Sequence, residues 1–137
     1  MIIVTGAGGG IGSSVTLHLA RLGNHVLATD IREESLAKVK EVAIYENLAI
    51  DFLSADMSDS AEVKGVFNHV SKKSSGIDGV VLCAGKTLRA NILQTNEQQF
   101  SDLIRTNLFG TYLVLRESGL YFQSSGKQGS IVVITSV

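Results

Sequence analysis

The stretch Met1-Ile-Ile-Val-Thr-Gly-Ala-Gly-Gly-Gly-Ile-Gly12 decides the fold of this chain. A short apolar strand at its start runs directly into a glycine-rich turn, and an amphipathic helical segment follows at once. In this order the turn holds a phosphate group over the first turn of a helix, where unpaired backbone N–H groups and the helix dipole favour negative charge. The stretch therefore predicts a dinucleotide-binding site.

Length and composition place the chain in a single domain, residues 1–137. Hydrophobic residues make up 45% of it and the net charge is −1, so nucleic acid and anionic membranes are not expected partners. No apolar run approaches the roughly 20 residues that span a bilayer. The single cysteine, Cys83, indicates a reducing, cytoplasmic location. The three histidines share no metal-ligand spacing with a third group, so no metal site is expected.

Strands and helices alternate along the chain, which predicts a parallel sheet covered by helices. Strands are expected at 2–5, 25–30, 49–54, 79–84 and 131–135, and helices at 11–22, 35–46, 59–70, 97–105 and 107–123. The core stripe of the first helix is expected to be Ile11, Val15, Leu19 and Leu22. Asp59 and Glu62 have the spacing of a capping box. The pattern predicts a doubly wound, Rossmann-like α/β sheet of about five strands in the order 3-2-1-4-5.

The glycine stretch has the form Thr-Gly-x-x-x-Gly-x-Gly over residues 5–12. This spacing resembles the short-chain dehydrogenase/reductase family. The resemblance implies an oxidoreductase that moves hydride between a nicotinamide dinucleotide and a small-molecule carbonyl or secondary alcohol. The residues expected around the pyrophosphate are Gly6, Gly8, Gly9, Gly10, Ile11 and Gly12.

Asp30 ends the second strand, where a carboxylate can accept both ribose hydroxyls of an adenosine. The same carboxylate would repel a 2′-phosphate, and the glycine loop has no Lys or Arg to compensate. NAD is therefore expected as the cofactor rather than NADP. Ile31 and Arg32 complete this part of the site, and Arg32 is the one residue that argues against the NAD assignment. A helix cap is the alternative role for Asp30.

Two further stretches resemble the family's cofactor site. Asp56-Met57 is similar to the pair that holds the adenine ring, and a cap for the next helix is the alternative for Asp56 or Asp59. Leu-Cys-Ala-Gly, at 82–85, stands where the family usually has Asn-Asn-Ala-Gly, so the backbone is expected to pass close to the cofactor ribose. The contacts expected there are Cys83, Ala84 and Gly85. A nucleophilic role for the cysteine is not expected, because no His or Lys neighbours it in sequence.

Asn107 and Ser136 occupy positions that the family uses in catalysis. Asn107 resembles the asparagine that kinks a helix and holds a water of a proton relay, and Ser136 resembles the serine that hydrogen-bonds the substrate oxygen. An ordinary helix asparagine and a turn serine are the alternatives. The family's Tyr-x-x-x-Lys proton donor does not occur in the sequence. Tyr112-x-x-x-Arg116 is the nearest spacing, and we interpret it as packing on a helix face.

The resemblance covers the whole chain but only about the first half of the family's catalytic domain. The sheet is therefore expected to be truncated before strands 6 and 7, and the chain alone is expected to be inactive. An open sheet edge at 131–135 and apolar residues after Asn107 predict a homo-oligomer. The strings 79–85 and 30–32 also resemble bacterial 3α-hydroxysteroid dehydrogenase members of the family, without defining a substrate. The alternative function is a non-catalytic nucleotide-binding module.

Overall fold

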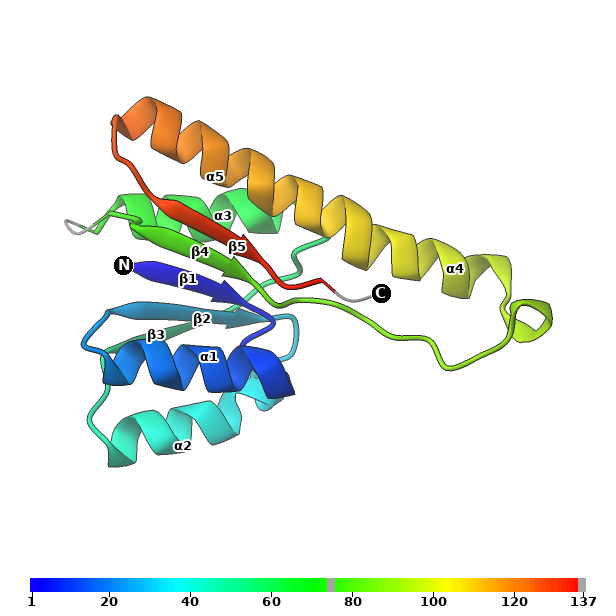
Figure 1. The fold of residues 1–137 in the computed structure, drawn as a ribbon, viewed down its shortest axis with the longest axis horizontal. Helices are drawn as coiled ribbons and strands as arrows, with labels where there is room; N and C mark the ends of the chain where they lie inside the picture. Colours follow the sequence, from blue (N-terminus) through cyan, green and yellow to red (C-terminus); the bar gives the residue numbers. More distant parts are fainter. Residues whose placement is uncertain (74–75, 136–137) are drawn as a thin grey trace.

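The computed structural model describes residues 1–73 and 76–135. They form three layers, with one parallel sheet between two layers of helices (Figure 1). The strands found in these residues are β1 (Ile2–Thr5), β2 (Val26–Asp30), β3 (Ile50–Ser54), β4 (Gly79–Leu82) and β5 (Ser130–Val133). They are parallel and lie in the order β3-β2-β1-β4-β5. The predicted fold class and strand order are confirmed, although β4 and β5 each end two residues earlier than expected.

Helices cover both faces of the sheet (Figure 1). One face carries α1 (Gly10–Arg21) and α2 (Ala37–Tyr45), which follows a 3-10 turn at Glu33–Leu36. The other face carries α3 (Ser60–Ser71) and α5 (Thr111–Ser125). α4 (Glu97–Ile104) continues into α5 through a π-helical turn at Arg105–Gly110, which we call the π-turn. The two helices form one long rod, and its α4 end extends beyond the sheet (Figure 1).

The core consists of two apolar layers, one on each face of the sheet. Ile3 and Leu27 face α3 and α5, whereas Val4 and Val26 face α1 and α2. This alternation follows from the two-residue period of a strand. The central strands are buried on both faces, as parallel strands between helices must be. Polar groups that could serve a ligand are therefore confined to the ends of the strands.

The first helix packs on the sheet through small side chains, and the predicted stripe is wrong at both of its ends. Its buried residues are Gly12, Thr16 and Ala20. Ile11 is 60% exposed and Leu22 is 66% exposed. A Cβ on Gly12 would lie 2.0 Å from the carbonyl oxygen of Gly6, so the start of α1 is too close to the loop after β1 for a larger residue.

The start of α3 shows half of the predicted capping box. The Asp59 carboxylate accepts hydrogen bonds from the N–H groups of Ala61 (2.7 Å) and Glu62 (3.0 Å). The Glu62 carboxylate does not return to Asp59; it accepts from the N–H of Asp56 at 2.6 Å. Glu62 therefore fixes the turn that follows β3. Behind this cap, the buried residues of α3 are Val63, Val66, Phe67 and Val70.

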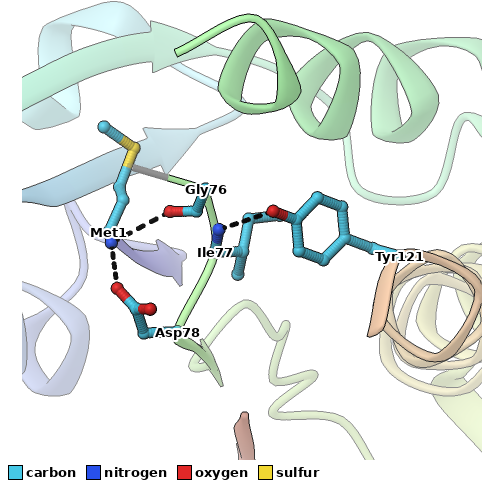
Figure 2. A network of polar contacts seen from close by, with 5 residues as sticks. All are labelled: Met1, Gly76, Ile77, Asp78 and Tyr121. Carbon is cyan, nitrogen blue, oxygen red and sulfur yellow. Dashed lines mark hydrogen bonds and ion pairs between the residues drawn. The ribbon is translucent and has the colours of Figure 1, made fainter. Parts of the chain in front are cut away.

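A polar network lies at the amino-terminal ends of the strands, which we call the amino edge of the sheet, around the start of β4 (Figure 2). The amino group of Met1 donates to the carbonyl of Gly76 (3.0 Å) and forms an ion pair with Asp78 (2.5 Å). The N–H of Ile77 donates to the phenolic oxygen of Tyr121 on α5 (2.9 Å). Ile77 is fully buried, so Tyr121 satisfies a donor that water does not reach. These contacts hold α5 at the edge opposite the carboxyl ends of the strands.

Candidate functional site

A cleft of about 780 Å³ opens at the carboxyl ends of the strands. It is lined by the loops that follow β1 to β4 and by the helix around the π-turn: Gly6, Gly9, Asp30, Ile31, Arg32, Asp56, Met57, Ser58, Cys83, Ala84, Gly85, Lys86, Asp102, Arg105 and Thr106. The strand order reverses between β1 and β4, and open parallel sheets bind ligands at such a switch point. The cleft thus brings together most of the predicted cofactor-binding residues.

Three glycines, two in the loop after β1 and one in the first turn of α1, are required by contacts within the protein. Gly6 has a φ of +62°, and a Cβ on it would lie 2.7 Å from the backbone of Ala84. A Cβ on Gly8 would lie 2.4 Å from the side chain of Ser35, and Gly12 is closed off by the Gly6 carbonyl. These residues bring the loop, β4 and the 3-10 turn before α2 into close contact. Their function is therefore to shape the site.

Gly10 differs from these three, because a Cβ on it would meet nothing within 4 Å. It is the first residue of α1, and the residue before it, Gly9, offers no side-chain cap. The first turn of α1 also contains no acidic side chain. The N–H groups of a first helical turn lack partners within the helix and carry partial positive charge. The start of α1 thus has room and donors for an anion, which fits the phosphates of a dinucleotide.

Asp30 is half-buried at the end of β2 and contacts the glycine loop directly. Its carboxylate accepts from the N–H of Gly8 (3.1 Å) and from the N–H of Arg32 (3.2 Å). The 3-10 turn that follows has no side-chain cap, so the helix-cap alternative is not what the structure contains. A carboxylate can accept about four hydrogen bonds, and two of these positions remain for ribose hydroxyls.

Asp56 and Met57 form a rigid turn after β3. One oxygen of Asp56 accepts from both the N–H and the hydroxyl of Ser58, each at 2.8 Å. The cap of α3 is Asp59, which leaves the second oxygen of Asp56 for a ligand. Met57 is 8% exposed and its side chain belongs to the core. Only the Met57 backbone can therefore contact an adenine ring.

The end of β4 contributes backbone to the cleft. Thr5 accepts from the N–H of Cys83 through its carbonyl (3.2 Å) and from the N–H of Ala84 through its hydroxyl (3.3 Å). Burial raises the pKa of the Cys83 thiol, so the thiol stays protonated at neutral pH. Cys83 is therefore a wall of the cleft and not a nucleophile.

Asn107 joins the π-turn to the loop after β4. Its side-chain oxygen accepts from the N–H of Lys86 (2.8 Å) and its side-chain nitrogen donates to the carbonyl of Lys86 (2.9 Å). Gly110 ends the same turn, and a Cβ there would lie 3.1 Å from the carbonyl of Met57. The π-turn therefore rests on the β3 loop and holds the β4 loop, so Asn107 is more than an ordinary helix asparagine.

Some predicted residues lie away from the cleft or outside the described part of the chain. Gly8, Gly10, Ile11, Gly12 and Asn107 do not line the cleft itself. Ser136 lies outside the described residues, so its expected role is not tested; the N–H of Ile134 donates to the carbonyl of Leu82 (3.0 Å) and carries the β5 end alongside β4. Five lining residues were not predicted: Ser58, Lys86, Asp102, Arg105 and Thr106.

The positions of these five residues explain why they were not predicted. Lys86 directly follows the predicted contact Gly85, and Arg105 and Thr106 directly precede Asn107. Their proximity to predicted positions was a usable signal. The resemblance at Asn107 indicated a kinked helix, but it did not show which neighbouring side chains the π-turn directs to the cleft. The described residues hold no group of three potential metal ligands. Within the same part of the chain, no helix has the length and apolar character to cross a membrane.

Comparisons with known proteins agree with this geometry. A model of the short chain dehydrogenase family matches residues 1–137. A short-chain dehydrogenase/reductase of Armillaria gallica is 31% identical over 132 residues, covering 95% of this chain and 51% of that protein. A 3-oxoacyl-[acyl-carrier-protein] reductase of Thermotoga maritima is 32% identical over 135 residues, covering 98% and 54%.

A solved structure shows the same likeness in three dimensions. The 3-ketoacyl-ACP reductase from Sinorhizobium meliloti superposes with a TM-score of 0.87 at 30% identity, covering 98% of this chain and 53% of that one. The chain spans about half the length of the relatives it matches.

Proposed function

The chain belongs to the short-chain dehydrogenase/reductase family, and on that premise we propose that it binds NAD as the nucleotide-binding part of an oxidoreductase. The reaction proposed is hydride transfer between the cofactor and a small-molecule carbonyl or secondary alcohol. The observation that carries the proposal is the common cleft of Gly6, Gly9, Asp30 and Asp56. A glycine loop alone is weak support for a dinucleotide, but the two carboxylates give it an adenosine site on the same wall.

The chain's own residues bind and orient the cofactor in this proposal. The pyrophosphate lies over the start of α1 at Gly10, the adenosine ribose lies against Asp30, and the adenine ring lies against the Asp56–Met57 turn. Asn107 keeps the loop after β4 in place through the backbone of Lys86. Bound NAD supplies the hydride acceptor.

Fewer residues are assigned to the substrate than to the cofactor. Ser136 is proposed to hydrogen-bond the substrate oxygen, by its match to the family position alone. Tyr-x-x-x-Lys does not occur in the 137 residues, so we assign no proton donor among them. A positioned acid typically contributes ~10²–10⁴ in rate. Cofactor binding is therefore the property of these residues to measure, and measurable turnover by them alone is not expected.

We also propose that a second copy of the chain covers the apolar face of the rod and the β5 edge. In the rod, Leu108 is 65% exposed and Tyr112 is 54% exposed, and the Tyr112 ring stacks on Phe109 at 6.0 Å. The β5 residues Ile131 to Val133 are also exposed. An apolar helix face beside an edge strand favours association. A single monomeric species at tens of micromolar by light scattering would contradict this assembly.

Calorimetric titration with NAD and NADP tests the cofactor assignment. A carboxylate facing a 2′-phosphate should disfavour NADP at least tenfold, or about 1.4 kcal/mol. Asp30→Asn should narrow that ratio, because the repelling charge is gone. Glu34→Gln, an exposed acid in the neighbouring 3-10 turn, removes the same charge as a control and should leave the ratio unchanged. Equal or tighter binding of NADP by the unaltered protein would show that Arg32 outweighs Asp30.

A further inference from the structure

The glycine loop carries no positive side chain, although the dinucleotide proposed for it carries two phosphates. Residues 5–12 contain neither Lys nor Arg. A helix N-terminus supplies only about half an elementary charge. Asp30 adds a negative charge on the same wall, because its carboxylate accepts from the N–H of Gly8. Further positive charge is available from the cations that line the cleft: Arg32, beside Asp30 on the ribose side, and Lys86 and Arg105 on the wall made by the β4 loop and the π-turn.

Lys86 and Arg105 line this cleft together with Gly6 and Gly9. Among the described residues, neither side chain makes a hydrogen bond or an ion pair. The acid one helical turn before Arg105 is Asp102, and its carboxylate accepts instead from the side chain of Gln98 at 2.8 Å. Both cations are thus available to a ligand in the cleft.

The backbone geometry places Lys86 close to the glycine loop. A Cβ on Gly6 would lie only 2.7 Å from Ala84, so the chain leaving β4 touches the loop. Lys86 is two residues further on, which is roughly 7 Å of extended chain, and its long side chain can span that gap. Asn107 holds both backbone groups of Lys86, so the point from which this side chain extends is fixed.

Arg105 approaches the cleft from the helix, at the end nearer to β3. Its positive charge contributes to the lowered pKa of Asp59, after the larger effect of the hydrogen bonds from the N–H groups of Glu62 and Ala61. The π-turn that begins at Arg105 contacts the turn after β3 through Gly110 and the loop after β4 through Asn107, so Arg105 enters the cleft between these two segments. The two cations stand on the wall made by the β4 loop and the π-turn, and the glycine loop forms the neighbouring wall.

We propose that Lys86 and Arg105 bind the phosphates of the dinucleotide from the wall next to the glycine loop. This inference rests on the proposed function and adds two binding residues to it. Charge-assisted contacts of this kind are short and about twice as strong as neutral hydrogen bonds. The phosphates would then be held by backbone N–H groups on one side and by two side chains on the other.

The test compares the affinities of the purified protein for ADP-ribose and for adenosine, measured by calorimetry in 50 mM NaCl. The variants are Lys86→Met, Arg105→Gln and the double variant. Lys72→Met removes one exposed charge at the opposite edge of the sheet and serves as the matched control. Lys86→Arg keeps the charge, and the hydrogen bonds to Asn107 involve only the backbone at this position.

We expect the double variant to lose about tenfold in affinity for ADP-ribose and to bind adenosine within twofold of the unaltered protein. The loss should shrink at 300 mM NaCl because salt screens the contacts. Lys86→Arg and Lys72→Met should bind ADP-ribose nearly as well as the unaltered protein. A loss below threefold, or an equal loss for adenosine, overturns the inference and leaves the proposed function standing. Failure of the unaltered protein to bind ADP-ribose would overturn both.

Discussion

The polar groups at the amino-terminal ends of the strands (the amino edge) and at their carboxyl-terminal ends (the carboxyl edge) have opposite roles. At the amino edge, polar groups pair with one another: Met1 pairs with Asp78 and the Ile77 N–H with Tyr121 (Figure 2). His25 and Lys73 also pair with Asp51 at this edge. At the carboxyl edge, the cleft has cations that form no ion pair within the described part of the chain, and a helix start without a side-chain cap. The first edge stabilises the fold and the second is free to bind a ligand, so changes at the two edges should have separable effects.

The largest effect is expected from a matched pair of glycine substitutions at the carboxyl edge. Gly12→Ala puts a Cβ 2.0 Å from the Gly6 carbonyl, so α1 must move away from the loop after β1, at a cost of about 3 kcal/mol in the free energy of unfolding. Gly10→Ala meets nothing within 4 Å and should stay within about 1 kcal/mol. Gly10→Ala should still weaken ADP-ribose binding, because the methyl group enters the phosphate space.

Urea denaturation measures the free energy of unfolding of both glycine variants, and calorimetry measures their affinity for ADP-ribose. Together they separate an effect on the fold from an effect on binding. Equal destabilisation by the two substitutions would show that Gly10 is required by the fold. Unchanged ADP-ribose affinity in Gly10→Ala would show that the phosphates do not lie over the start of α1.

A smaller effect is expected from Tyr121→Phe at the amino edge. The substitution removes the acceptor of the buried Ile77 N–H (2.9 Å), and an unsatisfied buried donor costs about 1–3 kcal/mol. Nucleotide affinity should not change, because the contact lies at the edge opposite the cleft. Tyr112→Phe removes the same group from a side chain that is 54% exposed and should change the free energy of unfolding little. Lost nucleotide affinity in Tyr121→Phe would show that the two edges are coupled.

The smallest effect concerns acid stability at Asp51. Burial raises the pKa of this carboxyl, but the Lys73 hydrogen bond and the charges of His25 and Lys73 outweigh burial and lower it below its usual value of 3.8. A group with a lowered folded pKa contributes stability above its unfolded pKa and loses it as the pH falls through the folded pKa. Asp51 is about one-third exposed, so this contribution should be below about 1 kcal/mol.

Asp51→Asn should therefore reduce the free energy of unfolding at pH 7 and flatten its decline below pH 4, as measured by urea denaturation across that range. Asp102→Asn, in a carboxylate bonded to Gln98 instead of a cation, is the matched control. If the free energy of unfolding of Asp51→Asn declined below pH 4 as it does in the unaltered protein, the lowered pKa would have no consequence for stability.

The sequence predicted the fold well because its signals were local. The alternation of strands and helices and the cap at Asp59 can be recognised from periodicity and capping chemistry alone. The position of the α1 face could not be predicted this way, because Gly12 and Ala20 are buried by a close approach of the helix to the strand that hydropathy does not register. Large residues such as Ile11 then remain exposed.

The candidate site was predictable where a motif fixes the backbone and unpredictable where tertiary contacts do. Asp30 and the glycine loop meet in the cleft as expected. Lys86 and Arg105 were missed because their approach depends on the π-turn and on the hydrogen bonds of Asn107 to the Lys86 backbone. Such contacts join segments that are distant in the sequence and leave no spacing to recognise.

Amide hydrogen exchange with and without saturating NAD tests the central claim most directly. The account predicts that NAD slows exchange in the glycine loop, in the turn after β3 and at 83–86, while residues 77–79 and Tyr121 at the amino edge exchange at an unchanged rate. No protection in the glycine loop, or protection confined to the amino edge, would contradict the assignment of the carboxyl-edge cleft as the dinucleotide site.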